Sequence, residues 1–437
     1  MKLPVPGTLR AAFAPTCTLN LIFGIDVLYY PKDKPRPLLS VIWALLTLTM
    51  DVVLLKMANF PELKVFMGST IAATNYRLNA HIHTIFIAVS MFTSQFRSQA
   101  TRNTFRKIIS INAKLKTLGI SDDYESVYKT QIIELVIGFT YMTILQIFDF
   151  LFVGLDYPNE SARTSFLLGT HHHMFFSFIF DFTYNTSIRY FCNRFRRLNS
   201  LLVELELQRK GRMQPSQESV STFSRRNFLV SNEIQGSAVS NRLIDNQRLL
   251  HIAKVVRKLH GDLCTTAMEL SRIFGFQVFL SIALSFGVSI ALLYTGYTLA
   301  ADSPSSSLLD DVMLKITAVL WIGFYIMKIT WLVIGCTATT REAKKTGELI
   351  KNILESAAIY NKDIRDEIYI LTLQLMQNPL CFTAQGFFTL DYTLLSKMIG
   401  SVATFLILMI QMRSIYELNN VRVNSTHSML LAANRTA

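Results

Sequence analysis

The chain has 437 residues, of which 51% are hydrophobic and 17% are charged, and its mean hydropathy is +0.32. This balance argues against a soluble globular protein and predicts a chain embedded in a membrane. The formal net charge of +13 does not indicate nucleic-acid binding, because the basic residues lie between apolar runs, as they do in cytoplasmic loops.

Residues 1–37 form the predicted cytoplasmic N-terminus. Three prolines and Asp26 interrupt any apolar core, so this stretch does not have the pattern of a signal peptide. We therefore expect the first spanning helix to act as its own insertion signal.

Seven hydrophobic segments are long enough to cross a bilayer, since about 20 helical residues span about 30 Å of hydrocarbon. They are residues 38–56, 79–96, 131–155, 165–187, 273–298, 312–340 and 393–412. The sequence therefore predicts an all-α fold with seven transmembrane helices.

The segments between these spans differ sharply in positive charge. Of the Lys and Arg residues outside the spans, 33 lie in one alternating set that includes residues 1–37, and six lie in the other. Positive charge stays on the cytoplasmic side, so we expect an intracellular N-terminus and an extracellular C-terminus. Acceptor sequences for N-glycosylation on the predicted outer side begin at Asn159, Asn424 and Asn434.

The domain organisation follows from the spans. Residues 38–187 hold spans one to four, 273–340 hold spans five and six, and 393–412 form the last span. Between them, residues 188–272 hold cytoplasmic helical extensions with a disordered loop at 211–241, and residues 341–392 hold cytoplasmic anchor helices. Residues 413–437 form an extracellular tail. The cytoplasmic helices are amphipathic. Since no single one of them buries its apolar stripe, we expect them to pack as a bundle.

Motifs for catalysis or metal binding are lacking in the sequence. The five cysteines show no CxxC pairing, and His171, His172 and His173 point about 100° apart on a helix and do not converge on one ion. No glycine-rich phosphate loop, HExxH or GxSxG motif is present. We predict no enzyme activity, no metal and no cofactor.

Polar side chains recur in the outer halves of the middle spans. Burying them in lipid is costly, so we expect them to face the bundle interior, either as a satisfied core network or as a pocket for a small organic molecule. The predicted ligand-binding residues are His81, His83, Gln146, Asp149, His172, Tyr294, Thr317 and Trp321. Asp51 and Asp181 also lie within spans, where we expect each to pair with a neighbouring helix in preference to forming a proton or ion relay.

The last span carries a polar stripe that includes Lys397, Gly400, Thr404 and Gln411. An amide within a spanning helix needs water or a partner, so Gln411 is expected to face another helix or an aqueous path.

Thr404 and Gln411 also belong to a recognisable motif. The run from Thr404 to Met412 is similar to the Thr-Tyr, five apolar residues, Gln-Phe signature of insect gustatory receptors, with Phe405 in place of Tyr and Met412 in place of Phe. The preceding run 382–391 also resembles the segment before that signature.

The resemblance implies a tetrameric ligand-gated channel, not selective among cations, in the plasma membrane of a sensory neuron. Its expected partners are a small-molecule tastant, permeating cations, membrane lipid, and identical chains or related receptors. The ligand pocket would lie between spans two to six on the outer side. The implied pore and gate residues are Gln411, Met412, Leu408, Ile407 and Thr404.

Two other protein classes are alternatives. A G-protein-coupled receptor has seven spans but the opposite orientation, and a small-molecule transporter would show internal repeats or broken helices, which this sequence lacks. For the ligand, we favour a bitter or plant compound over a fructose-type sugar.

Overall fold

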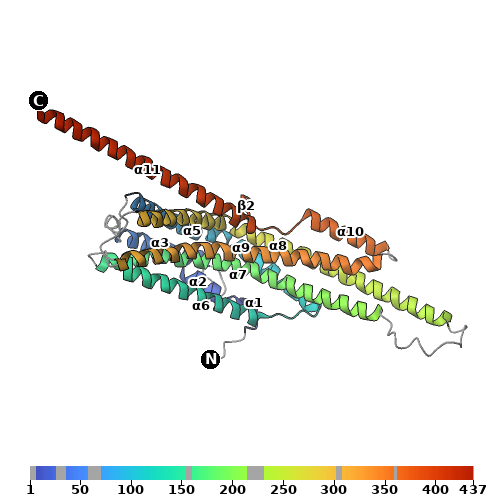
Figure 1. Ribbon diagram of the computed structural model, residues 1–437. Helices are drawn as coiled ribbons and strands as arrows, with labels where there is room; N and C mark the ends of the chain where they lie inside the picture. The colour runs from blue at the N-terminus through green and yellow to red at the C-terminus, as the bar shows by residue number, and fades with distance from the viewer. Residues whose placement is uncertain are drawn as a thin grey trace.

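The computed structural model describes residues 6–25, 36–57, 70–153, 160–213, 231–301, 308–358 and 362–436. Almost all of these residues are helical, and the long helices run side by side in one elongated bundle (Figure 1). The predicted all-α architecture is confirmed.

Six of the predicted spans each lie within one long helix, and the described part of the third covers two consecutive helical elements. These helices are α3 (Pro37–Met57), α5 (Thr70–Thr117), α6 (Tyr124–Phe148), α7 (Glu160–Met213), α8 (Ser231–Ala301), α9 (Leu308–Ala358) and α11 (Tyr392–Thr436), and the third span continues from α6 into the π-helix η2 (Asp149–Val153). Among the described residues, α3, α6, α8, α9 and α11 are long and apolar enough to cross a membrane by composition alone.

Helix α7 forms the centre of the bundle, which explains why its composition is less apolar than that of its neighbours. Its aromatic side chains Phe176, Phe180, Phe182 and Phe191 are fully buried, and so are polar ones such as Asp181. Since lipid is as apolar as the core, close packing supplies much of the cohesion here. Gly138 of α6 lets that helix approach, because a Cβ atom there would overlap the Phe178 ring.

Two short helices at the N-terminus, α1 (Leu9–Ala12) and α2 (Ala14–Ile22), pack into the bundle. Phe13 between them is buried, and its ring contacts Phe105 edge-on, with ring centroids 5.8 Å apart. Gln131 of α6 accepts a hydrogen bond from the Thr16 hydroxyl at 2.7 Å and donates one to the Ala12 carbonyl at 2.9 Å. The N-terminal helices are thus tied to the spanning helices, a contact that the sequence pattern does not predict.

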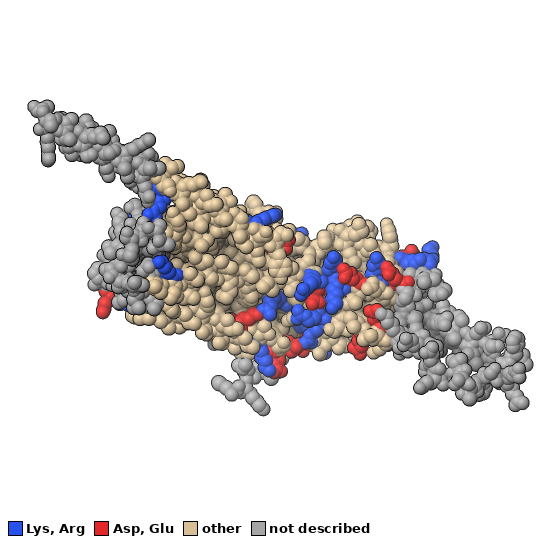
Figure 2. Space-filling view, viewed as in Figure 1, with Lys and Arg blue, Asp and Glu red and all other residues tan. Residues whose placement is uncertain are grey.

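Helices α5, α7, α8 and α9 extend well beyond the predicted spans and pack with α10 (Lys362–Gln377). Ion pairs join these extensions, with Lys107 Nζ 2.6 Å from Glu269 Oε1 and Lys114 Nζ 2.8 Å from Asp262 Oδ2. Figure 2 shows charged side chains gathered on this part of the visible face, beside a broad zone almost without charge.

The prediction of a disordered loop over residues 211–241 is wrong at both ends of that segment. Residues 211–213 belong to α7 and residues 231–241 to α8, whereas 214–230 lie outside the described residues. Adding residues to an existing helix is far less costly than nucleating one, so polar residues next to a long helix readily join it.

A small hairpin connects α10 to α11. Strand β1 (Thr383–Ala384) pairs antiparallel with β2 (Phe388–Thr389), and the turn uses positive φ angles at Gln385 and Gly386. Asp391 then caps α11 by accepting a hydrogen bond from the Thr393 backbone N–H at 2.9 Å.

Helix α11 leaves the bundle at an angle (Figure 1). It continues to Thr436, so residues 413–436 of the expected tail are helical and include the acceptors Asn424 and Asn434. The acceptor Asn159 lies outside the described residues.

Candidate functional site

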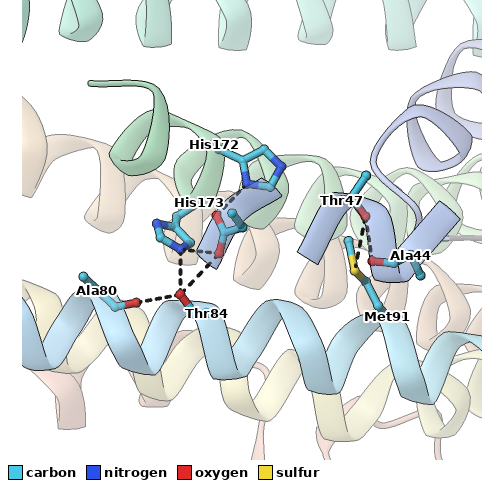
Figure 3. Close-up of polar contacts among 8 residues, drawn as sticks. Ala44, Thr47, Ala80, Thr84, Met91, His172 and His173 are labelled. Carbon is cyan, nitrogen blue, oxygen red and sulfur yellow. Dashed lines mark hydrogen bonds and ion pairs between the residues drawn. The ribbon is translucent and has the colours of Figure 1, made fainter. Parts of the chain in front are cut away.

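Asp51 of α3 is fully buried and joins three helices through its carboxylate. Its Oδ1 lies 2.9 Å from His172 Nδ1, and its Oδ2 lies 3.1 Å from His173 Nε2. The Thr84 hydroxyl of α5 donates to Oδ2 at 3.2 Å. Figure 3 shows His172, His173 and Thr84 turned toward one another in this group, which we call the Asp51 cluster.

The order of residues on α7 explains this geometry. Side chains at adjacent positions of a helix diverge by about 100°, so two neighbouring histidines reach different oxygens of one carboxylate while the next one points elsewhere. His171 accordingly contacts Asp149 instead of Asp51. A buried carboxylate is tolerated only when it is paired and hydrogen-bonded, and these contacts meet that condition.

Asp149 is the centre of a second group, the Asp149 cluster. It is the first residue of η2 and is 3% exposed. The Trp321 indole N–H of α9 donates to its two carboxylate oxygens at 3.1 and 3.2 Å, and His171 Nε2 lies 3.1 Å from Oδ2. Short π-helical turns often occur at functional sites, and this one directs a carboxylate into the bundle.

Tyr325 connects the two clusters. Its ring stacks on Trp321, with centroids 6.2 Å apart, and its hydroxyl lies 3.5 Å from His83 Nε2. The His83 ring in turn lies 5.6 Å from that of His173. Polar and aromatic side chains from α3, α5, α7, η2 and α9 therefore form one continuous group, which has the mixed character of a small-molecule site.

The structure brings together half of the predicted ligand-binding residues. His83, Asp149, His172 and Trp321 belong to the connected group; Tyr294 and Thr317 are buried on α8 and α9, and Gln146 is half-buried. His81 lies on the exposed side of α5, so the expectation that it faces the interior is wrong. Residues i and i+2 of a helix point about 200° apart. When His83 faces the site, His81 therefore faces away from it.

Five members of the group were not among the predicted ligand-binding residues. They are Asp51, Thr84, His171, His173 and Tyr325. The available signal was the acidic residue within a span, since an intramembrane carboxylate needs partners and consecutive histidines can supply them.

Asp181 has its partner in Lys328 of α9, deeper in the bundle. Lys328 Nζ lies 3.0 Å from Asp181 Oδ2 and also donates to the hydroxyls of Ser177 and Ser281. The Ser281 hydroxyl of α8 donates to Asp181 Oδ2 at 2.9 Å. The pair thus links α7, α8 and α9 at a position two helical turns along α9 from Trp321 of the Asp149 cluster.

The predicted gate residues lie on the exposed surface of α11, a helix that packs little against its own chain. Ile407, Leu408 and Met412 are 56%, 49% and 63% exposed, and Thr404 and Gln411 are also exposed. Contact with the bundle comes from other positions, such as Phe405, whose ring meets Phe286 of α8 with centroids 6.1 Å apart.

Residues 19–415 match the family model described as 7tm chemosensory receptor. The chain is similar to the candidate gustatory receptor 28a of Drosophila melanogaster, at 25% identity over 183 residues that cover 40% of this chain and 39% of that receptor. It is also similar to the gustatory receptor for bitter taste 66a of the same species, at 23% identity over 209 residues, or 46% of this chain and 39% of that receptor. These matches span well under half the length of either relative.

Solved structures give a likeness over nearly the whole chain. The olfactory receptor OR5 from Machilis hrabei superposes with a TM-score of 0.56 at 14% identity, covering 92% of this chain and 98% of that one. The same receptor in complex with eugenol gives a TM-score of 0.51, covering 91% of this chain and 98% of that one. At this identity the likeness shows a shared fold. The resemblance to insect gustatory receptors is confirmed by the family match and the sequence relatives, and a G-protein-coupled receptor is not favoured.

Proposed function

Since the chain belongs to the 7tm chemosensory receptor family and is a multi-pass membrane protein, we propose that it is a gustatory receptor that works as a ligand-gated, non-selective cation channel. A small-molecule tastant opens a pore surrounded by the α11 helices of four chains. The four chains are identical, or they combine with related receptors. The N-terminus lies inside the cell and the C-terminus outside, in the plasma membrane of a sensory neuron.

The main support comes from the surface of α11. Thr404 and Gln411 are exposed on a helix apolar enough to cross a membrane. A polar amide facing hydrocarbon loses several kcal/mol of hydration, so contact with lipid is an unfavourable environment for Gln411. A water-filled path lined by several copies of α11 supplies the missing hydration.

The gate follows from the same helix. Gln411 and Met412 form the outer constriction, and Leu408, Ile407 and Thr404 line the pore one and two turns deeper. Apolar rings from four copies close the path by dewetting, and amide rings replace part of the hydration shell of an ion when the path opens. The described residues of α11 offer no carboxylate between Tyr392 and Ile415, which fits weak discrimination among cations.

The tastant binds at the Asp51 and Asp149 clusters and the aromatic residues between them. His83, Asp149, His172 and Trp321 are the contact residues that the sequence also predicted, and Gln146, Tyr294 and Thr317 remain further candidates. Binding shifts the channel only by its differential affinity for the open form, typically about 1–3 kcal/mol of coupling. The similarity to a relative named for bitter taste favours a bitter or plant compound, with a fructose-type sugar second.

Expression in cells without endogenous receptors tests the proposal. We expect a panel of bitter compounds and sugars to produce at least one calcium response and single-channel events in excised patches. A C-terminal epitope tag is expected to stain without permeabilisation. N-linked glycans are expected at Asn159, Asn424 or Asn434, because the proposed orientation places these residues outside the cell. Uptake of a compound without channel events would favour a transporter and overturn the proposal.

A further inference from the structure

A cavity of about 40 Å³ lies away from the site described above, between α2, α5, α7 and α8. Since one water needs roughly 10–15 Å³ by this measure, the cavity has room for about three waters or one compact oxyanion. Its lining mixes apolar side chains with polar ones: the described residues around it include Arg97, Asn20 and Thr101 but no Asp or Glu.

Three hydrogen-bond donors reach this cavity from two helices. Arg97 and Thr101 are four residues apart on α5, so their side chains lie on the same face of that helix. Asn20 of α2 uses its Oδ1 to accept the Thr183 hydroxyl at 2.9 Å, and its Nδ2 makes no hydrogen bond to any residue that the structure describes. A guanidinium, an amide NH₂ and a hydroxyl are the groups that bind phosphate oxygens.

Aromatic rings hold the guanidinium in place. Arg97 Cζ lies 4.2 Å from the centroid of the Phe274 ring and 5.5 Å from that of Phe180. A guanidinium that stacks through its face keeps its N–H groups in the plane of the fork, where they suit a planar or tetrahedral oxyanion. These ring contacts therefore restrict the position of the Arg97 guanidinium at the cavity.

Residues from three predicted spans place the cavity at one depth in the membrane. Arg97 is the first residue after the second predicted span, Ser187 is the last residue of the fourth, and Phe274 is the second residue of the fifth. In the proposed orientation all three positions lie at the cytoplasmic boundary of the hydrocarbon. Phosphate groups of lipids lie at that depth, and the cytoplasmic leaflet carries the anionic lipids.

We propose that this cavity binds the phosphate of an anionic lipid headgroup from the inner leaflet. Arg97, Thr101 and Asn20 hold the phosphate oxygens, and the acyl chains remain in the bilayer beside α5. Because Asn20 belongs to α2, the bound headgroup ties the N-terminal helix to the transmembrane bundle. The proposal rests on the proposed membrane orientation, and it does not depend on channel activity.

Binding to the purified full-length receptor tests this, with dioctanoyl phosphatidylinositol phosphate as the probe and native mass spectrometry and thermal unfolding as readouts. We expect the probe to bind and stabilise the wild type, and Arg97→Gln to weaken binding by about tenfold, the loss of one charge-assisted hydrogen bond. Arg106→Gln is the matched control, since Arg106 is exposed on the same helix and lies outside the cavity. If Arg97→Gln does not give a monodisperse protein, the near-isosteric Thr101→Val, at a half-buried position, is expected to weaken binding as well.

Two further ligands separate the sources of the phosphate. Dioctanoyl phosphatidylcholine, which has no net charge, is expected to stabilise the wild type no more than the anionic lipid stabilises the Arg97→Gln variant. Inorganic phosphate that binds as tightly as the lipid, with the same loss in Arg97→Gln, would support the anion site but overturn the lipid as its source. Equal binding of the anionic lipid to the wild type, Arg97→Gln and Thr101→Val would overturn the site altogether.

Discussion

Trp321 donates its indole N–H to both carboxylate oxygens of Asp149, at 3.1 and 3.2 Å. The contact joins α9 to the π-helical turn at the end of α6, and His171 from α7 completes it. One indole thus hydrogen-bonds to a buried carboxylate and forms part of an aromatic wall. These two roles can be separated by substitution.

Trp321→Phe keeps an aromatic ring and removes the N–H donor. We expect a loss of about 1–3 kcal/mol in the free energy of unfolding, because a buried acceptor loses a partner. If the tastant binds at this site, its half-maximal concentration also changes. Trp331→Phe is the control on the same helix, where the ring packs on Phe178 and Phe182. Equal effects of both substitutions on the tastant response would exclude a special role for Trp321.

Lys328 and Asp181 form a buried ion pair whose members are 4% and 1% exposed. Lys328→Met leaves the carboxylate without its cation, and we expect it to cost about 3–5 kcal/mol. The double variant Lys328→Met with Asp181→Leu removes both charges and is expected to recover most of that loss. Thermal unfolding of the purified receptor measures both. A double variant that is less stable than the single one would show that the pair does not act as a unit.

Six of the seven predicted spans each lie within one helix of the structure, and they could be predicted because length and hydropathy are local properties. Among the described residues, α5 and α7 are not among the helices that length and composition alone identify. Asp51 was recognised as needing a partner, but its histidines were not identified, since that pairing depends on how α3 is rotated against α7. Lys328 was missed because one cation in a long apolar run does not alter the pattern of a span. The docking of α2 depends on single contacts such as Thr16 with Gln131, more than 100 residues away in sequence.

His260 predicts a dependence of stability on pH. It is buried on the extension of α8, where its Nε2 lies 3.0 Å from the Ala343 carbonyl oxygen, and burial lowers its pKa below the ordinary value of 6.5. Because the folded pKa is depressed, the neutral ring contributes stability that is complete above the unfolded pKa and is lost as the pH falls.

We therefore expect the wild-type receptor to lose thermal stability as the pH is lowered from about 7.5 to about 5.5, on either side of the unfolded pKa of His. His260→Gln is expected to remove part of that dependence. His251→Gln, at an exposed position of the same helix, serves as the control and is expected to keep it. Identical pH profiles for the wild type and His260→Gln would rule out this contribution.

Gln411→Ala tests the gate. If amides from several α11 helices hydrate the ion at the constriction, their removal changes single-channel conductance or the basal leak, because a ring of amides becomes a ring of methyl groups. Met398→Leu is the control, since Met398 lies on the face of α11 that packs against its own chain. Currents measured in excised patches distinguish this from a loss of surface expression. Unchanged conductance, leak and ligand response in Gln411→Ala would place the constriction elsewhere, and the pore would then not be formed by this face of α11.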